Sequence, residues 1–166
     1  MTLFYFDTST LLKRYKNESG SLVVNFIFEN KVENASIVTS FLSVIELNGV
    51  IARLKKAKAL TGEEADGILF YFDQDVEKEV VITPVTDNVL TKAVEISGRH
   101  GNRAADSIHA ATIVNLNEDA HRTKVKLIAV VSDKHLIETL SDSGITVLNP
   151  EERENMTLAE MRELFL

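Results

Sequence analysis

The stretch LFYFDTSTLLKRY, residues 3–15, joins an apolar run to an aspartate, three hydroxyl residues and a second apolar pattern. Residues 2–6 are rich in aromatic side chains and predict a short buried strand, and the spacing after Asp7 predicts a helix over residues 8–16. Asp7 therefore stands where strand and helix meet. Two roles are open to it: it caps the helix, or it brings a catalytic or metal-binding carboxylate to the edge of a sheet.

The rest of the chain alternates predicted strands with predicted helices. The further predicted strands cover residues 37–39, 80–83, 127–131 and 145–148. The further predicted helices cover residues 20–30, 41–57, 61–75, 88–99, 103–116 and 134–140. Strands separated by helices predict a single α/β domain with a parallel β-sheet flanked by helices on both faces.

The composition is that of an ordinary globular domain, with 45% hydrophobic and 26% charged residues. Cysteine is absent, which excludes disulfides, thiolate zinc sites and a cysteine nucleophile. The net charge of −7 argues against indiscriminate nucleic-acid binding, although acids clustered on a divalent cation repel a phosphate less than their number suggests. No apolar run reaches the ~20 residues of a membrane span and no secretory signal is evident, so we expect a cytoplasmic protein without membrane contact.

Four carboxylates interrupt segments that are otherwise apolar. They are Asp7, Glu46, Asp106 and Asp133. A lone carboxylate is costly to bury unless it is paired or ligates a metal. Asp7 and Asp133 both end predicted strands, so both project from the carboxyl edge of the sheet, where strands ~4.8 Å apart allow two carboxylates to share one cation. Without thiolates, such a site suits Mg²⁺ or Mn²⁺ and the hydrolysis of phosphate esters.

Each acid also has a structural interpretation. The two acids that end strands fit helix N-caps, and Asp106 near a helix start is favoured by the helix dipole. Ser43 and Glu46 match a capping box, although Ser40 could cap the same helix and place Glu46 deeper, on its buried side. These alternatives stay open on the sequence alone.

The acids and their neighbours together resemble the PIN domain, particularly the VapC-type toxin endoribonucleases. The segments that carry the resemblance are Asp7-Thr8-Ser9, Ser40 with Glu46, Arg103-Ala-Ala-Asp106-Ser-Ile-His109-Ala-Ala and Val131-Ser-Asp133-Lys-His-Leu, in family order. The resemblance implies a single-domain PIN-like fold over residues 1–150 that binds Mg²⁺ or Mn²⁺ and hydrolyses RNA phosphodiesters with an activated water. The metal ligands it implies are Asp7, Glu46, Asp106 and Asp133, and the supporting residues are Ser9 and Ser132.

The resemblance further implies the toxin of a type II toxin–antitoxin pair, with a cognate antitoxin as partner, RNA as substrate and a homodimer. Lys13, Arg14 and Arg103 are candidate RNA contacts because they lie close to the acids in the sequence. The basic run RLKKAK, residues 53–58, either contacts phosphates or is a solvated helix end whose cations stabilise the helix C-terminus. Residues 115–126, interpreted as a long charged loop, depart from a compact family member.

Residues 151–166 are expected to add a C-terminal amphipathic helix that docks on the core or across a dimer. Thr157 and Glu160 predict its capping box. Its predicted apolar stripe consists of Leu158, Met161, Leu164 and Phe165.

Two further questions stay open. His109, three residues after Asp106 on the predicted helix, is either a ligand or general base or, as the favoured interpretation, a packed side chain with local hydrogen bonds. The other open class of function is a non-catalytic PIN-like module that binds RNA or a protein partner. An enzyme would lose activity but keep its fold on Asp7→Asn or Asp106→Asn, whereas a binding module would tolerate both changes.

Overall fold

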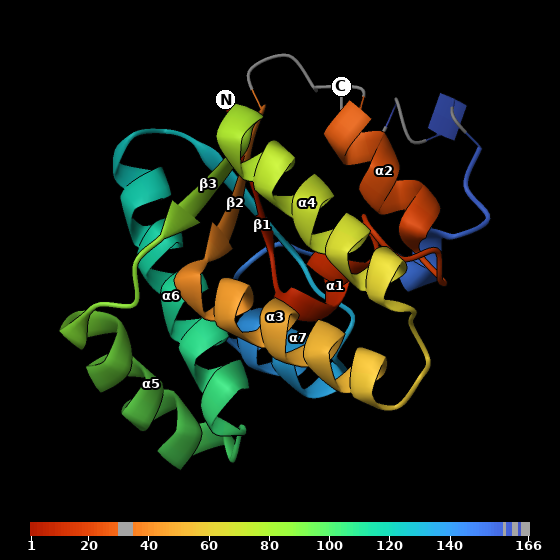
Figure 1. Cartoon of the computed structure of the whole chain (residues 1–166). Coiled ribbons are helices and arrows are strands. Elements are labelled where there is room, and N and C mark those ends of the chain that lie inside the picture. Colours follow the sequence, from red (N-terminus) through yellow and green to blue (C-terminus); the bar gives the residue numbers. More distant parts are fainter. Residues whose placement is uncertain (30–34, 158, 161–162, 164–166) are drawn as a thin grey trace.

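The computed structural model describes residues 1–29, 35–157, 159–160 and 163. The described strands are β1 (Thr2–Phe6), β2 (Ala35–Ser40), β3 (Val80–Thr83), β4 (Lys126–Val130) and β5 (Val147–Leu148). They form one sheet in the order β3-β2-β1-β4-β5, and every pairing is parallel (Figure 1). The predicted fold class is therefore confirmed.

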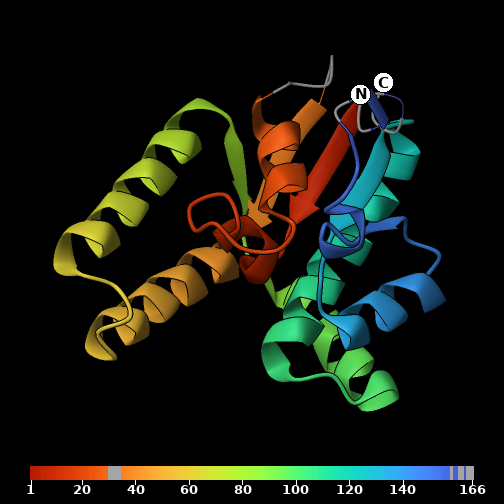
Figure 2. The same ribbon diagram turned by 90° about the vertical axis from the view of Figure 1, so that its right-hand side faces the viewer.

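The helices form the outer layers. In the described chain they are α1 (Thr8–Leu12), α2 (Ser21–Glu29), α3 (Phe41–Lys56), α4 (Gly62–Lys78), α5 (Asp87–His100), α6 (Ala104–Arg122), α7 (Lys134–Asp142) and the 3₁₀ turn η1 (Glu151–Arg153). Figure 2 shows α3 and α4 on one side of the sheet and α6 and α7 on the other. This arrangement buries both faces, as a parallel sheet requires. Among the described helices, none combines the length and the apolar character needed to cross a membrane.

The central strand β1 contributes side chains to two hydrophobic cores. Because strand side chains alternate between faces, Phe4 and Phe6 pack with Leu47 of α3 on one side of the sheet. Tyr5 points to the other side and packs with Leu136 of α7. All five side chains are buried, so β1 is fixed from both faces and the position of the residue that follows it is fixed as well.

The register brings the strand ends to one edge. Phe6, the last residue of β1, is paired with Thr39 of β2 and with Val130 of β4. Asp7 follows directly, and Asp133 follows β4 after two intervening residues. Both acids therefore leave the sheet at its carboxyl edge.

The structure contradicts part of the expected element boundaries. Helix α6 continues to Arg122, so most of the predicted loop 115–126 is helical. The charged residues there lie on the exposed side of a helix whose buried side continues to Ala120, and composition alone cannot distinguish such a helix from a loop. Smaller differences are the earlier end of α1 at Leu12 and the later start of β5 at Val147.

The expected C-terminal helix falls only partly within the described residues. Its predicted capping box is present: Thr157 N and Oγ1 donate to Glu160 Oε2 at 2.7 and 2.8 Å, and Glu160 N donates to Thr157 Oγ1 at 3.3 Å. Leu158, Met161, Leu164 and Phe165 of the predicted stripe lie outside the described residues. The amphipathic extension over residues 151–166, and a domain boundary at residue 150, stay predictions.

Truncation of Leu47 tests the packing of α3 on the sheet. We expect Leu47→Ala to lower the free energy of unfolding by about 2–5 kcal/mol, because it removes fully buried methyl groups and leaves a cavity. Ile45→Ala, on the same helix where the side chain is 61% exposed, is the matched control, with a change within about 0.5 kcal/mol. Urea unfolding followed by circular dichroism measures both, and equal losses would contradict this packing.

Candidate active site

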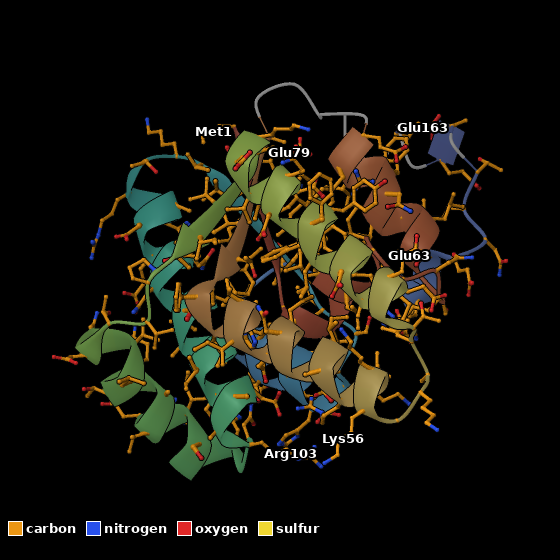
Figure 3. The ribbon with its side chains drawn as sticks, in the orientation of Figure 1. Met1, Lys56, Glu63, Glu79, Arg103 and Glu163 are labelled. Atoms are coloured by element: carbon orange, nitrogen blue, oxygen red, sulfur yellow. The ribbon has the colours of Figure 1, made fainter. Side chains whose placement is uncertain are left out.

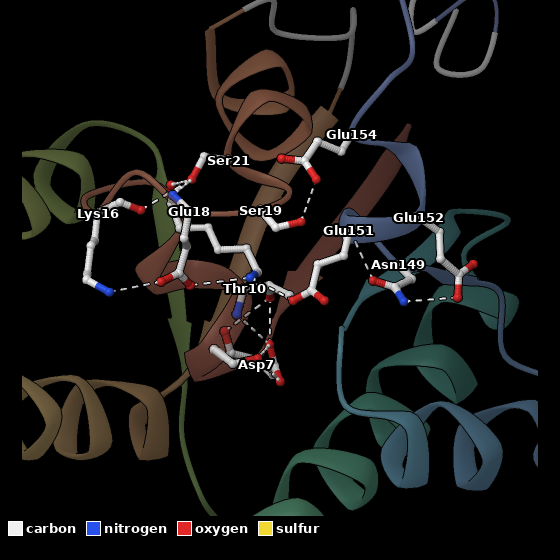
Figure 4. Close-up of polar contacts among 12 residues, drawn as sticks. Asp7, Thr10, Lys16, Glu18, Ser19, Ser21, Asn149, Glu151, Glu152 and Glu154 are labelled. Atoms are coloured by element: carbon white, nitrogen blue, oxygen red, sulfur yellow. Dashed lines mark hydrogen bonds and ion pairs between the residues drawn. The ribbon is translucent and has the colours of Figure 1, made fainter.

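Asp7 caps α1 with one of its two carboxylate oxygens. Oδ1 accepts hydrogen bonds from Thr10 N at 2.9 Å and Thr10 Oγ1 at 2.6 Å, contacts visible in Figure 4. The Thr10 hydroxyl also lies 2.8 Å from the carbonyl oxygen of Val130, so the cap is tied to the end of β4. Ser9 Oγ donates to both carboxylate oxygens, at 3.1 and 2.9 Å, and is the one described donor to Oδ2. The Asp7 side chain is therefore held in place by these hydrogen bonds, and the residue is 5% exposed.

Asp133 uses its carboxylate in the same way at the start of α7. Oδ1 accepts a hydrogen bond from Leu136 N at 2.8 Å, and no bond to Oδ2 is found among the described residues. The cap interpretation is thus correct for both acids that end strands. Each cap occupies mainly one oxygen, so capping does not prevent the same carboxylate from binding a cation.

Glu46 lies in the second turn of α3, because Ser40 and not Ser43 is the N-cap: Ser40 Oγ accepts from Leu42 N at 3.2 Å. The half-buried carboxylate receives two side-chain donors from other helices, Thr8 and His109. The His109 hydrogen bond outweighs the effect of burial and, with help from the Thr8 hydroxyl, lowers the pKa of Glu46 below its ordinary value. Glu46 is therefore ionised and oriented.

His109 is buried, with 3% exposure, between β1 and α3. Its Nδ1 lies 2.7 Å from the Tyr5 hydroxyl and its Nε2 lies 3.1 Å from Glu46 Oε2. It is thus a packed, hydrogen-bonded side chain, and its partner is one of the four acids, which the sequence did not indicate.

Asp106 lies half-buried in the first turn of α6. Burial, and then the negative charge of Asp133, raise the pKa of Asp106, and Glu46 adds to the same effect. The charges of His109 and Arg103 oppose it. Asp106 is therefore within electrostatic reach of two other acids, and a bound cation would relieve their mutual repulsion.

The donor set fits a hard divalent cation in its chemistry. In the described part of the chain, no three His, Asp or Glu side chains already form a metal cage. The four acids nevertheless supply only oxygen ligands, and Asp133 Oδ2 and Glu46 Oε1 have no hydrogen bond within the described residues. Mg²⁺ and Mn²⁺ prefer such oxygen ligands. Asp7, Glu46, Asp106 and Asp133 thus stay the predicted ligands.

The two serines predicted to support the acids differ in their surroundings. Ser9 donates to Asp7, as described above. Ser132 Oγ is buried and makes no hydrogen bond of ordinary geometry among the described residues. It lies near Glu151, where Lys13 first and the Ser132 hydroxyl to a smaller extent lower the pKa of the Glu151 carboxyl.

Lys13 is a buried cation held by two acids. Its Nζ lies 2.9 Å from Glu151 Oε1 and 3.3 Å from Glu18 Oε1, and both acids appear in Figure 4. Burial alone would lower the pKa of Lys13, but the contacts with Glu151 and Glu18 outweigh it and raise the pKa. An RNA phosphate would have to compete with these carboxylates for the ammonium.

Arg14 follows the end of α1 and binds acids on α2 and α4. Its guanidinium donates to Glu29 at 3.0 Å and to Asp75 at 3.3 Å, and lies 5.0 Å from the ring centre of Phe28. The structure therefore gives this predicted RNA contact a role in joining helices.

Arg103 and the basic end of α3 lie on the side of the carboxyl edge. Figure 3 labels Arg103 and Lys56 at the lower end of the view, the end toward which β2 points in Figure 1, with Met1 at the upper end. A cavity of about 270 Å³ lies between α1 and α3; its lining includes Thr8, Ser9, Leu12, Glu46, Val50 and Arg53. Arg53 follows Glu46 by two helical turns, and this spacing is the sequence signal that could have placed it beside the acids.

Comparison with known proteins gives a family and a fold. The PIN domain matches residues 4–139. Among solved structures the chain is similar to VapBC2 from Rickettsia felis bound to a DNA fragment from its promoter (TM-score 0.62, 14% identity, 89% of this chain and 98% of that chain). It is also similar to FitAcB from Neisseria gonorrhoeae (TM-score 0.54, 19% identity, 89% of this chain and 97% of that chain). A third similar structure is a toxin-antitoxin complex from Klebsiella pneumoniae (TM-score 0.51, 16% identity, 88% of this chain and 96% of that chain). At these identities the likeness shows the fold, and no curated protein matches the sequence.

Two substitutions of Asp133 separate its cap from its charge. We expect Asp133→Ala to lower the free energy of unfolding by about 0.5–2 kcal/mol because Leu136 N loses its acceptor, and Asp133→Asn to change it little because asparagine caps equally well. Urea unfolding of both variants beside the wild type measures the difference. Equal destabilisation by the two variants would argue against the cap.

Proposed function

Since this chain belongs to the PIN domain family, whose members are nucleases, we propose that it is an endoribonuclease that hydrolyses RNA phosphodiester bonds with Mg²⁺ or Mn²⁺. The observation that carries the proposal is that Asp7 and Asp133 follow neighbouring parallel strands at the carboxyl edge of the sheet, where the charges of Asp133 and Glu46 also act on Asp106. In open α/β sheets this edge is where ligands bind.

The four acids would hold the cation with the oxygens that their caps and hydrogen bonds leave available. A bound Mg²⁺ or Mn²⁺ supplies a water of lowered pKa and neutralises charge that develops on a phosphate. The protein's own part is to keep the carboxylates oriented: Thr10 fixes Asp7, Leu136 N fixes Asp133, and His109 fixes Glu46. Such preorganisation removes the cost of ordering the ligands when the cation binds.

Arg53 and Arg103 are the proposed phosphate contacts. Arg53 lines the cavity beside Glu46, and its charge contributes to the lowered pKa of that acid, after the larger effects of His109 and Thr8. Arg103 acts in the same direction on Asp106. Local cations next to the acids would attract RNA in spite of the net charge of −7. Lys13 and Arg14 are weaker candidates because carboxylates already hold them.

We also propose a cytoplasmic toxin of a toxin–antitoxin pair, which acts as a homodimer and is blocked by an antitoxin. The support is that two similar structures carry names of toxin–antitoxin systems, VapBC2 and the Klebsiella pneumoniae complex. A non-catalytic PIN-like module that binds RNA or protein is the alternative, and the following experiment decides between them.

Loss of one ligand carboxylate tests the nuclease. We expect Asp7→Asn and Asp106→Asn to lower RNA cleavage by at least about 100-fold while the fold persists. Substitution of a residue that only orients a metal ligand costs up to about 100-fold in activity, so loss of a ligand should cost at least as much. Asp66→Asn, an exposed acid on α4, is the matched control and should cleave like the wild type. The measurement is the appearance of new RNA 5′ ends after induction in cells, with purified protein and Mn²⁺ as the direct assay.

The cellular assay and the purified-protein assay distinguish a nuclease from a binding module. Discrete new ends with the wild type and Asp66→Asn, but not with Asp7→Asn, would support the nuclease and identify its target RNA. Equal cleavage by all variants, or growth arrest without new ends, would reject the nuclease and favour the binding module.

Substitution of Arg53 tests the phosphate contact. In an Asp7→Asn background that keeps RNA intact, we expect Arg53→Gln to weaken RNA binding and to reduce the slope of log K against log salt by about 0.7, as expected for one lost contact to a single strand. Lys55→Gln, on the same helix but paired with Asp66 at 3.4 Å, is the control and should change less. Fluorescence anisotropy across a salt series measures both; identical slopes for the two variants would remove Arg53 from the interface.

A further inference from the structure

Four polar side chains from four elements form one hydrogen-bonded chain beside the acids. They are Tyr5 of β1, Thr8 of α1, Glu46 of α3 and His109 of α6. Tyr5 is fully buried and His109 nearly so, and the Tyr5 ring packs in a hydrophobic core, with the buried hydroxyls of Ser40 and Thr112 near its own hydroxyl. Burial of a phenol and an imidazole is costly unless each finds a partner, and an apolar pair would fill the same space without that cost. The pair therefore calls for a role besides packing.

His109 is bonded at both ring nitrogens. Its Nε2 lies 3.1 Å from Glu46 Oε2 and 3.3 Å from Thr8 Oγ1, and its Nδ1 lies 2.7 Å from the Tyr5 hydroxyl. A carboxylate oxygen accepts, so Nε2 donates to Glu46. The Tyr5 ring also meets the imidazole edge to face, with 6.0 Å between the ring centroids. These contacts hold the imidazole in one orientation.

Both donors to Glu46 reach the same oxygen. Thr8 Oγ1 and His109 Nε2 contact Oε2, and no described residue donates to Oε1. A glutamate on a helix surface samples several rotamers, and two donors from separate helices restrict it to one. The arrangement thus orients the carboxylate and leaves Oε1 without a donor from the part of the chain that the structure describes.

We propose that His109, itself held by Tyr5, is a positioning residue that fixes Glu46 Oε2 so that Oε1 stays available to a divalent cation. The inference rests on the proposed metal-dependent function. Histidine here acts through the acid and is not a ligand, since both ring nitrogens are already bonded within the protein. Side chains that orient metal ligands in this way typically contribute 10–100-fold to metal affinity.

A double-mutant cycle on Mn²⁺ affinity tests the proposal without RNA. Mn²⁺ binding to the full chain is measured by electron paramagnetic resonance of the free ion. We expect His109→Leu to weaken binding about 10–100-fold, and His109→Gln, which keeps a donor, to weaken it less. Tyr5→Phe, which removes one hydroxyl, should shift the affinity in the same direction. Ser21→Ala, which removes a buried hydroxyl that bonds Lys13 O, is the control and should leave Mn²⁺ affinity unchanged.

The decisive comparison is made in a Glu46→Gln background. If His109 acts through Glu46, His109→Leu has no further effect on Mn²⁺ affinity there, whereas a general structural role would weaken binding equally in both backgrounds. An equal effect, or no effect of His109→Leu on the wild type, overturns the proposal. If His109→Leu does not fold, the same cycle with Tyr5→Phe decides, and additive effects overturn it.

Two wild-type measurements separate this inference from the proposed function. A wild type that binds Mn²⁺ and cleaves RNA, beside a His109→Leu variant of equal affinity, overturns the positioning role and leaves the nuclease in place. A wild type that neither binds Mn²⁺ nor cleaves RNA overturns both.

Discussion

Parallel pairing of β1 with β2 on one side and β4 on the other is the constraint on which the rest of the structure depends. Parallel neighbours require crossover connections, so helices must cover both faces of the sheet, and β1 becomes accessible only at its ends. The same pairing sends the residues after β1, β2 and β4 to one edge. Asp7, Ser40 and Asp133 therefore begin α1, α3 and α7 next to each other, although more than a hundred residues separate the first from the last.

The two interpretations of the acids that end strands prove compatible. A carboxylate has two oxygens, and a helix N-cap needs one of them. Asp7 gives Oδ1 to Thr10 and Asp133 gives Oδ1 to Leu136 N, while Glu46 gives Oε2 to Thr8 and His109. Structural hydrogen bonds of this kind hold a side chain still, which is also what a ligand of a small, demanding cation such as Mg²⁺ requires.

The strands, the parallel sheet and the positions of the four acids could be predicted because they depend on local pattern and on topology. The contacts that pair distant residues could not. His109 is 63 positions from Glu46 and 104 from Tyr5, and nothing in its local sequence indicates either partner. Lys13 is predicted to contact RNA, but in the structure it is buried and its ammonium is bound to two acids, one of which is 138 positions away. The sequence predicts a loop where residues 115–122 are helical, because the charged side chains of this part of α6 face solvent and resemble those of a loop.

The contact between Lys13 and Glu151 also bears on how the protein is made. The loop after α1 is bound a second time to the segment after β5, where Ser19 donates to Glu154 at 2.7 Å and the left-handed Gly20, whose φ is +86°, leaves space for Pro150. During synthesis from the N-terminus, α1 emerges long before these partners do. Until residue 151 has left the ribosome, the buried ammonium lacks its nearer carboxylate, and α1 lacks the segment that closes over its end. The contacts that close over the end of α1 therefore become possible only when nearly the whole domain has been translated, and Asp133 of the acidic edge comes from the same late part of the chain.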